Sequence, residues 1–123
     1  MARILVIDDE ELARFTLREI LEASGHDVVE AANGNEGTMM QKATPCDMVI
    51  TDMIMPDKEG LETIVELKTD NPNLKIIAIS GGGRTKNLDF LNLAAEFGAD
   101  KIIIKPFSEE ELMEGVNACL AGA

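Results

Sequence analysis

Residues 48–57 read MVITDMIMPD, and this stretch decides which fold the chain can adopt. Its first four residues form an apolar run of strand length that ends at Asp52. A strand that is apolar on both faces is typical of a parallel sheet covered by helices. A carboxylate beside apolar side chains is costly unless another group at the site offsets its charge. The stretch therefore predicts a buried parallel strand and a chemical reason for Asp52 at its end.

Apolar runs of strand length alternate with amphipathic runs of helix length along the whole chain. The strands are expected at residues 3–8, 26–32, 48–51, 75–80 and 101–104. Right-handed crossovers between such strands give an α/β fold, a doubly wound (βα)5 sandwich of three layers. Because parallel strands share one direction, their carboxyl ends meet at one edge of the sheet.

The helices carry recognisable start and stop signals. The first is expected within 10–25, with Gly25 as its stop and with one apolar stripe made of Leu12, Phe15, Leu17, Ile20 and Leu21. Asn33 is the expected cap of a helix over 34–43, and Ser108 the expected cap of the last helix, which runs to about residue 120. Two further helices are expected near 60–70 and near 86–97. The apolar face of the former consists of Leu61, Ile64, Val65 and Leu67.

The composition describes an ordinary globular protein and excludes several functions. The chain has 123 residues, of which 46% are hydrophobic and 28% charged. We expect a single domain over 1–123 with no output domain, located in the cytoplasm, because no apolar stretch reaches the ~20 residues of a membrane span. A net charge of −12 argues against nucleic-acid binding and favours cations and basic partner surfaces. Cys46 and Cys119 are expected to be reduced thiols packed as small apolar groups.

Polar residues collect where the predicted strands end. Asp8 and Asp9 follow the first strand, Asp52 the third, Ser80 ends the fourth, and Lys105 follows the fifth. Three carboxylates in one small pocket require a counter-charge, and a single lysine supplies only one. Mg²⁺, which prefers oxygen ligands and keeps several waters, suits such a site. The set predicts a carboxylate nucleophile with a metal, a hydroxyl and a lysine arranged around a transferring phosphoryl group.

Each residue of this set also has an ordinary interpretation when it is taken alone. The Asp8–Asp9 pair could cap the first helix, Asp52 could belong to a turn, Ser80 to a loop, and Lys105 to a solvated surface. The coincidence of all of them at one edge of the sheet favours the functional interpretation.

Four motifs, ILVIDDEE (4–11), DMVITDMIMPDKEG (47–60), IIAISGG (76–82) and GADKIIIKPF (98–107), give the chain a family resemblance. It resembles the receiver domain of two-component response regulators, in particular the stand-alone receivers of the chemotaxis type. The resemblance covers the whole chain. It implies a flavodoxin-like sheet with strand order 2-1-3-4-5.

The resemblance also implies a role for each acidic residue. Asp52 is the expected phosphoacceptor, which forms an acyl phosphate in a reaction that the domain itself catalyses, without being an enzyme in any other sense. Asp9 and Asp52 are expected to ligate Mg²⁺ directly, together with the backbone carbonyl of Ile54. Asp8 is expected to act on the metal through water.

Ser80 and Lys105 are implied to bind phosphoryl oxygens, and the Lys105–Pro106 bond to be cis. The expected donor is a phosphohistidine on a sensor histidine kinase or phosphotransfer protein. Phosphorylation is expected to draw Ser80 inward and to change a surface formed by the last two helices and the fifth strand. That surface would bind a downstream target protein and could form a weak homodimer. Relatives usually carry an aromatic switch residue where this chain has Ile102.

The glycine-rich loop 80–87 is a second departure from the family pattern. We expect it to be poorly ordered without phosphate and to tighten when Asp52 is modified.

Two other functions fit parts of the pattern. An aspartate-based Mg²⁺ phosphohydrolase would use Asp8 as nucleophile and Glu10 as acid and base, but such enzymes place an aspartate at the second position and carry a cap. A receiver-shaped adaptor that works without phosphorylation would need none of the acceptor residues that are present here.

Overall fold

The computed structural model describes residues 2–53, 60–80, 92 and 94–122, and within them the predicted sheet is present. All five strands pair in parallel in the order β2-β1-β3-β4-β5, which confirms the doubly wound, flavodoxin-like fold. The strands are β1 (Arg3–Ile7), β2 (Asp27–Ala31), β3 (Met48–Asp52), β4 (Lys75–Ser80) and β5 (Lys101–Ile104). Predicted and observed strand bounds agree within one residue, so each polar residue of the site lies at a strand end as expected.

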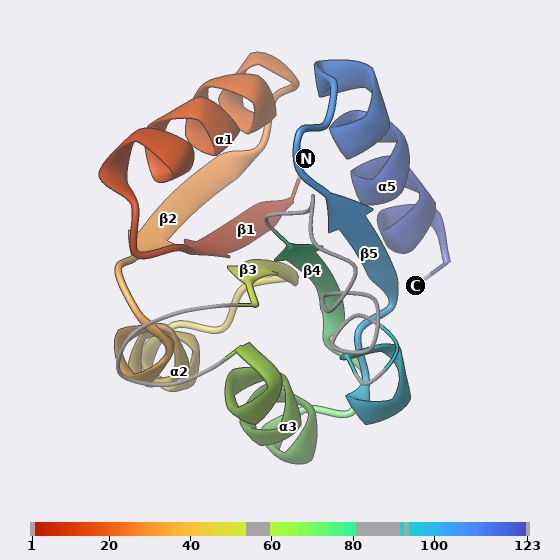
Figure 1. The fold of residues 1–123 in the computed structure, drawn as a ribbon. Helices are drawn as coiled ribbons and strands as arrows, with labels where there is room; N and C mark the ends of the chain where they lie inside the picture. Colours follow the sequence, from red (N-terminus) through yellow and green to blue (C-terminus); the bar gives the residue numbers. More distant parts are fainter. Residues whose placement is uncertain (1, 54–59, 81–91, 93, 123) are drawn as a thin grey trace.

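Helices cover both faces of the sheet and complete three layers (Figure 1). The helices α1 (Glu11–Ala23) and α5 (Glu109–Ala121) lie on one face, and α2 (Gly34–Ala43) and α3 (Gly60–Asp70) on the other. Residues 92 and 94–97 are also helical, in agreement with the helix predicted near 86–97, whose earlier part lies outside the described residues.

The predicted caps are present and explain where the helices begin and end. Asn33 accepts a hydrogen bond from the backbone N–H of Glu36 (2.8 Å). Ser108 forms a capping box with Glu111, in which each side chain accepts a hydrogen bond from the other residue's backbone N–H. Gly25 follows α1 with φ +91°, a conformation that L side chains rarely adopt.

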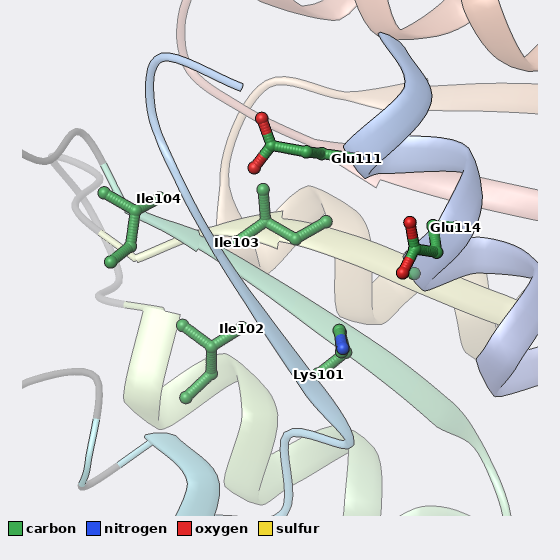
Figure 2. Close-up of a pocket in the computed structure, with 7 residues that line it drawn as sticks. Lys101, Ile102, Ile103, Ile104, Glu111 and Glu114 are labelled. Atoms are coloured by element: carbon green, nitrogen blue, oxygen red, sulfur yellow. The ribbon is translucent and has the colours of Figure 1, made fainter. Parts of the chain in front are cut away.

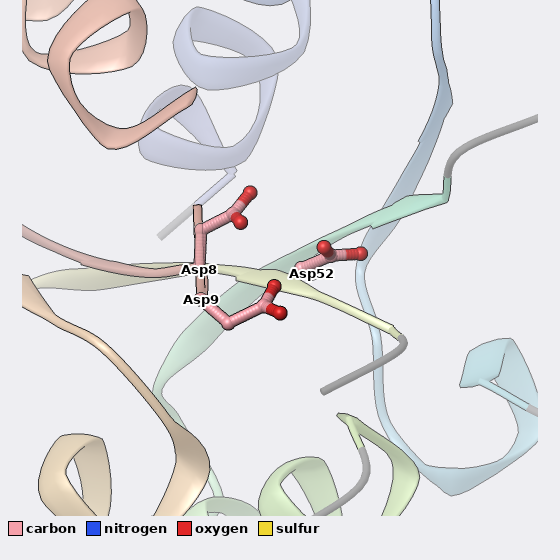
Figure 3. Close-up of side chains that lie close together, drawn as sticks. All are labelled: Asp8, Asp9 and Asp52. Atoms are coloured by element: carbon pink, nitrogen blue, oxygen red, sulfur yellow. The ribbon is translucent and has the colours of Figure 1, made fainter. Parts of the chain in front are cut away.

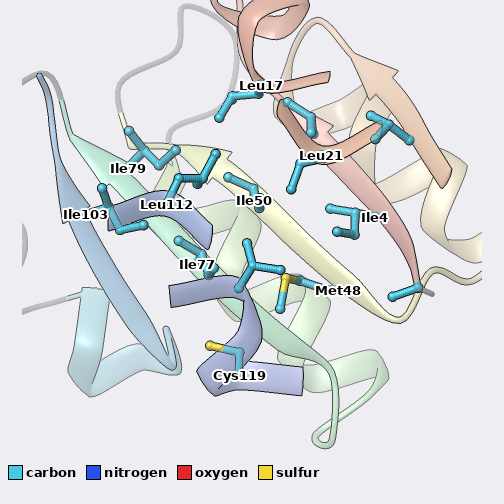
Figure 4. Close-up of a cluster of buried hydrophobic side chains, with 14 residues drawn as sticks. Ile4, Leu17, Leu21, Met48, Ile50, Ile77, Ile79, Ile103, Leu112 and Cys119 are labelled. Carbon is cyan, nitrogen blue, oxygen red and sulfur yellow. The ribbon is translucent and has the colours of Figure 1, made fainter. Parts of the chain in front are cut away.

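Two apolar clusters fill the space between the layers. Alternate residues of each central strand point to opposite faces, so Ile4 and Val6 join one cluster and Leu5 and Ile7 the other. The first cluster lies under α1 and α5 (Figure 4) and includes Leu17, Leu21, Met48, Ile50, Ile77, Ile79, Leu112 and Val116. The second, under α2 and α3, includes Val49, Met53, Ile64, Leu67, Ile76 and Ala78. A sheet buried on both faces holds its strand ends rigidly.

The prediction that Leu12 and Phe15 belong to the buried apolar stripe of α1 is wrong. Leu17 and Leu21 are buried, but Leu12 is 76% and Phe15 56% exposed. With 3.6 residues per turn, Leu12 and Phe15 lie on the side of the helix opposite Leu17 and Leu21. Near the start of α1 the side chain of Arg14 is instead mostly buried, with 16% exposure.

Two further apolar residues are more exposed than expected. Val65, placed on the apolar face of α3, is 42% exposed, and Phe97 is 49% exposed although it is a large apolar residue. Leu61, Val65 and Phe97 line a shallow apolar depression together with Glu62 and Glu66. A helix can contact the sheet along one stripe only, so apolar residues at the margin of that stripe stay partly in water.

Cys46 and Cys119 are free, buried thiols, as predicted. Burial raises the pKa of both, which keeps them protonated and unreactive. No helix in the described part of the chain is both long and apolar enough to cross a membrane.

Candidate functional site

Three carboxylates meet at the carboxyl edge of the sheet (Figure 3). One oxygen from each of Asp8, Asp9 and Asp52 lies within 4.8 Å of the others. The strands β1 and β3 are paired with Ile7 opposite Thr51, so the next residues, Asp8 and Asp52, stand side by side. Asp8 is 1% and Asp52 8% exposed, whereas Asp9 is open to solvent. The sequence therefore predicted correctly that these three side chains form one pocket.

Asp8 is held at four atoms. Its backbone N–H donates to the carbonyl oxygen of Ala31 on β2 (3.1 Å), and its own carbonyl oxygen accepts from Nη1 of Arg14 (2.6 Å). Its Oδ1 accepts from the backbone N–H of Glu10 (2.9 Å), and its Oδ2 is 3.5 Å from Nζ of Lys105. Both carboxylate oxygens of Asp8 thus have partners within the protein.

Lys105 reaches the pocket from the residue after β5. The ion pair with Asp8 joins two positions that the sequence placed at the same edge, and the Lys105 side chain is 26% exposed. The Lys105–Pro106 peptide bond is cis, as the family resemblance implied. One ammonium cannot by itself balance three neighbouring carboxylates, so the pocket favours a further cation.

The backbone around Asp52 is fixed by close packing against the start of α3. The hydroxyl of Thr51 donates to the Asp52 carbonyl oxygen (3.0 Å), and the N–H of Gly60 donates to the carbonyl oxygen of Met53 (3.0 Å). A Cβ at position 60 would lie 2.7 Å from the Asp52 carbonyl oxygen and 2.6 Å from Cα of Met53. Only glycine fits at this contact, a role that the sequence reasoning missed because it depends on the distance between two elements.

The acidic triad fits a small divalent cation. Ligand oxygens around Mg²⁺ are separated by about 3 Å at adjacent and about 4 Å at opposite positions of its octahedron. The carboxylate oxygens of the triad, all within 4.8 Å of one another, need to move little to reach that spacing. All three donors are hard oxygen ligands, which Mg²⁺ and Ca²⁺ prefer.

Two predicted site residues are only partly described. The backbone of Ser80 ends β4 opposite Ile104 of β5, at the same edge as the triad, but its side chain is outside the described part of the structure. Ile54 and residues 81–87 of the glycine-rich loop also lie outside the described residues. The predictions made for the Ile54 carbonyl, the Ser80 hydroxyl and the loop stay predictions.

The edge strand β5 presents alternating side chains to its two sides (Figure 2). Ile103 points toward α5 and is buried, whereas Ile102 and Ile104 point away from that helix. Ile102 is half-buried against the cluster under α2 and α3, and Ile104 is 46% exposed. Between β5 and α5 runs a shallow groove lined by Lys101, Ile102, Ile103, Ile104, Glu111, Glu114 and Gly115.

A charged network lies beside the pocket, on the α1 and β2 side. Nε of Arg14 is 3.1 Å from Oε1 of Glu30, and Nη1 of Arg18 is 2.7 Å from Oε2 of the same carboxylate. The hydrogen bond from Arg18, followed by that from Arg14, lowers the pKa of Glu30 against the opposing effect of burial. The sequence reasoning missed this network. Its only signal in the sequence is that Arg14 and Arg18 are one turn apart on the same helix.

Fold and site together define a flavodoxin-like α/β domain with an acidic triad and a lysine at the carboxyl edge of its sheet. The model of the response regulator receiver domain family matches residues 4–117, and the chain belongs to this family. The acidic triad is of the kind that is typical of the magnesium site in receiver domains.

Several relatives of similar length agree with this assignment. The chain is 34% identical to the chemotaxis protein CheY of Thermotoga maritima, covering 94% of each chain. It is 33% identical to the protein PilH of Pseudomonas aeruginosa, covering 99% of this chain and 100% of PilH. A crystal structure of a response regulator receiver domain protein from Clostridium thermocellum superimposes with a TM-score of 0.90 at 32% identity, covering 98% of this chain and 95% of that one.

Proposed function

We propose that this protein is the phosphoacceptor of a two-component system or phosphorelay. It takes a phosphoryl group from a phosphohistidine onto Asp52 in a Mg²⁺-dependent reaction. The observation that carries the proposal is the pocket in which oxygens of Asp8, Asp9 and Asp52 lie within 4.8 Å of one another, with Lys105 paired to Asp8. Membership of the receiver family supports a histidine kinase or histidine phosphotransfer protein as the donor.

Asp52 is the best placed of the three carboxylates to become phosphorylated. Asp9 is exposed to water, and Asp8 is the carboxylate that is paired with Lys105. Asp52 ends the central strand β3 and is 8% exposed, which limits the access of water to an acyl phosphate formed there. Asp52 also occupies the acceptor position of the family motif.

Asp9 and Asp52 would hold Mg²⁺ directly, with the Ile54 carbonyl as a third protein ligand, and Asp8 would act through a water molecule. The partners of both Asp8 oxygens support the indirect role. When bound, Mg²⁺ would offset the negative charge that the phosphoryl oxygens bring into the pocket.

The transfer requires little covalent chemistry from the protein. A carboxylate oxygen of Asp52 forms a bond to phosphorus while the bond from phosphorus to the imidazole nitrogen breaks. The Lys105 ammonium, 3.5 Å from Asp8, is near enough to turn toward a phosphoryl oxygen, and Ser80 would donate to another. Attack of water on the acyl phosphate would release inorganic phosphate and restore the carboxylate.

The signal would leave through the helix predicted near 86–97, β5 and α5 toward a target protein, and the same surface would support a weak homodimer. Ile102 is the proposed switch residue together with Ser80, because it lies on β5, which pairs with the strand that Ser80 ends. A half-buried isoleucine at this position supports a smaller rearrangement than an aromatic ring would give.

Mass spectrometry after incubation with acetyl phosphate tests the proposal. With Mg²⁺ the protein should gain one phosphoryl group, located on Asp52, and without Mg²⁺ or in Asp52→Asn it should gain none. Phosphatase turnover that survives Asp52→Asn would support the hydrolase alternative, with Asp8 as nucleophile. Absence of both Mg²⁺ binding and phosphorylation in the unmodified protein would support the adaptor.

A further inference from the structure

We propose that Arg14 is a positioning residue for the cation site. Its guanidinium fixes the peptide between Asp8 and Asp9, and thereby sets where both carboxylates stand when a divalent cation binds. This inference rests on the proposed function, because it concerns the same pocket. It goes beyond that function by assigning a role to a side chain that touches neither cation nor phosphoryl group.

The contact that carries the inference is made to the backbone. Nη1 of Arg14 donates to the carbonyl oxygen of Asp8 at 2.6 Å, and the Arg14 side chain is only 16% exposed. That carbonyl belongs to the peptide unit that joins Asp8 to Asp9. Because a peptide unit is planar, fixing its oxygen also fixes the direction in which the chain enters Asp9.

The segment between β1 and α1 depends on such a contact. β1 ends at Ile7 and α1 begins at Glu11, so residues 8–10 lie between two regular elements. Glu10, at the N-cap position of α1, makes no side-chain cap hydrogen bond. Asp9 is exposed and belongs to the triad, so its position is set through the peptide before it and the start of the helix.

An arginine suits this position because its planar fork donates in two directions at once. Nη1 faces the Asp8 carbonyl while Nε faces Glu30 on β2, at 3.1 Å. Glu30 is held in turn by Arg18, 2.7 Å away. The guanidinium therefore connects the end of β1 to α1 and to the neighbouring strand.

The expected effect is one of geometry rather than of charge. The positive charge of Arg14 is paired with the carboxylate of Glu30, so the two together exert only a weak field on the triad. Groups that orient metal ligands typically contribute 10-fold to 100-fold to metal affinity. A purely electrostatic role would have the opposite sign, since removing a cation near the pocket would strengthen Mg²⁺ binding.

The test compares Arg14→Gln with Arg18→Gln. Both variants remove one guanidinium from Glu30, but only the first removes the contact with the Asp8 carbonyl. Mg²⁺ affinity is measured by isothermal titration calorimetry, and the Mg²⁺ dependence of phosphorylation is measured with acetyl phosphate. Arg14→Gln should raise the dissociation constant about 10-fold or more, and the Mg²⁺ concentration that gives half-maximal phosphorylation should rise with it. Arg18→Gln should change the constant less than about threefold.

Two further variants keep the result interpretable. Arg14→Lys retains the charge but loses the planar guanidinium with its several N–H donors. Its Mg²⁺ affinity should therefore lie between those of Arg14→Gln and the unmodified protein. Glu30→Gln keeps Arg14 but weakens its anchor, and should weaken Mg²⁺ binding severalfold even if Arg14→Gln does not fold. Because it also leaves two arginines without their counter-charge, the loss is measured at high salt, where the field of the arginines is screened. Urea unfolding checks that each variant is folded.

Equal Mg²⁺ affinity in Arg14→Gln and Arg18→Gln would overturn the inference, as would tighter binding in Arg14→Gln or an unchanged affinity in Glu30→Gln. Failure of the proposed function can be distinguished from failure of this inference. In that case the unmodified protein itself would neither bind Mg²⁺ nor accept phosphate on Asp52.

Discussion

At the residue scale, Asp52 is held in place by a neighbour that has no side chain. Gly60 begins α3 directly against the backbone of Asp52 and Met53, where an added Cβ would meet only main-chain atoms. A side chain in the way could rotate aside, but the backbone of a buried strand end cannot. The position of the proposed phosphoacceptor therefore depends on the absence of a methyl group at residue 60, because a Cβ there would lie 2.7 Å from the Asp52 carbonyl oxygen.

Gly60→Ala should destabilise the protein by about 1–3 kcal/mol, because α3 must move away from β3 to make room. The same shift should slow phosphorylation of Asp52 by acetyl phosphate. Gly122→Ala is the matched control, since a Cβ there would approach no atom closer than 3.5 Å and φ is −79°. Urea unfolding measures the stability of both variants. A Gly60→Ala protein as stable as the control would show that the contact relaxes freely.

Glu30 gives a second prediction at this scale, concerning pH. Hydrogen bonds from Arg18 and Arg14 lower its pKa in the folded protein below the value in the unfolded chain. The stabilisation is therefore fully present above the unfolded pKa and is lost as the pH falls through the folded pKa. Glu30→Gln should lose less stability than the unmodified protein between neutral and acidic pH. Urea unfolding at both pH values measures this, and an equal loss in both proteins would contradict the assignment.

At the scale of the elements, features that depend on local sequence, such as where a helix starts, were predictable, whereas contacts between elements were not. The starts of α2 and α5 follow from Asn33 and Ser108, whose side chains act on the nearest turn only. The exposure of Leu12 and Phe15 could not be read from spacing alone, because it depends on how α1 is rotated against the sheet. Arg14 takes the sheet-facing position near the start of α1 because β2 offers Glu30 there.

Ser108→Ala tests the contribution of a local signal to a whole element. It removes one side of the capping box and should cost about 1 kcal/mol of stability. Thr16→Ala is the control within a helix. Its hydroxyl bonds the carbonyl of Leu12 on an exposed face, so alanine there should be neutral or slightly stabilising. Thermal and urea unfolding would compare the two, and equal effects would mean that the cap contributes nothing specific.

At the scale of the whole molecule, the site was predictable because the topology does most of the positioning. Asp8, Asp52 and Lys105 each follow or end a strand, and a parallel sheet brings such residues to one edge whatever the details of packing. Gly60 and Arg14 escaped prediction because their roles depend on how closely a helix approaches the end of the preceding strand, which the spacing of residues in the sequence does not give. The same topology concentrates negative charge at one edge of a chain whose net charge is already −12.

That concentration of charge predicts how the whole fold responds to magnesium. A ligand that binds only the folded state stabilises it in proportion to the logarithm of its concentration, by about 2.7 kcal/mol at 100 times the dissociation constant. Millimolar Mg²⁺ should therefore raise the midpoint of urea unfolding of the unmodified protein, and a chelator should reverse the effect. Asp52→Asn removes one ligand and one negative charge of the triad.

The Asp52→Asn variant should consequently be at least as stable as the unmodified protein without Mg²⁺, because less like charge is crowded into the pocket, and should gain much less from added Mg²⁺. Glu109→Gln provides the control, since it also removes one negative charge but lies at the start of α5. If Glu109→Gln lost the Mg²⁺ response as fully as Asp52→Asn, the stabilisation would come from general screening of an acidic protein. If only Asp52→Asn loses the Mg²⁺ response and Glu109→Gln keeps it, the stabilisation comes from a cation bound at the edge of the sheet.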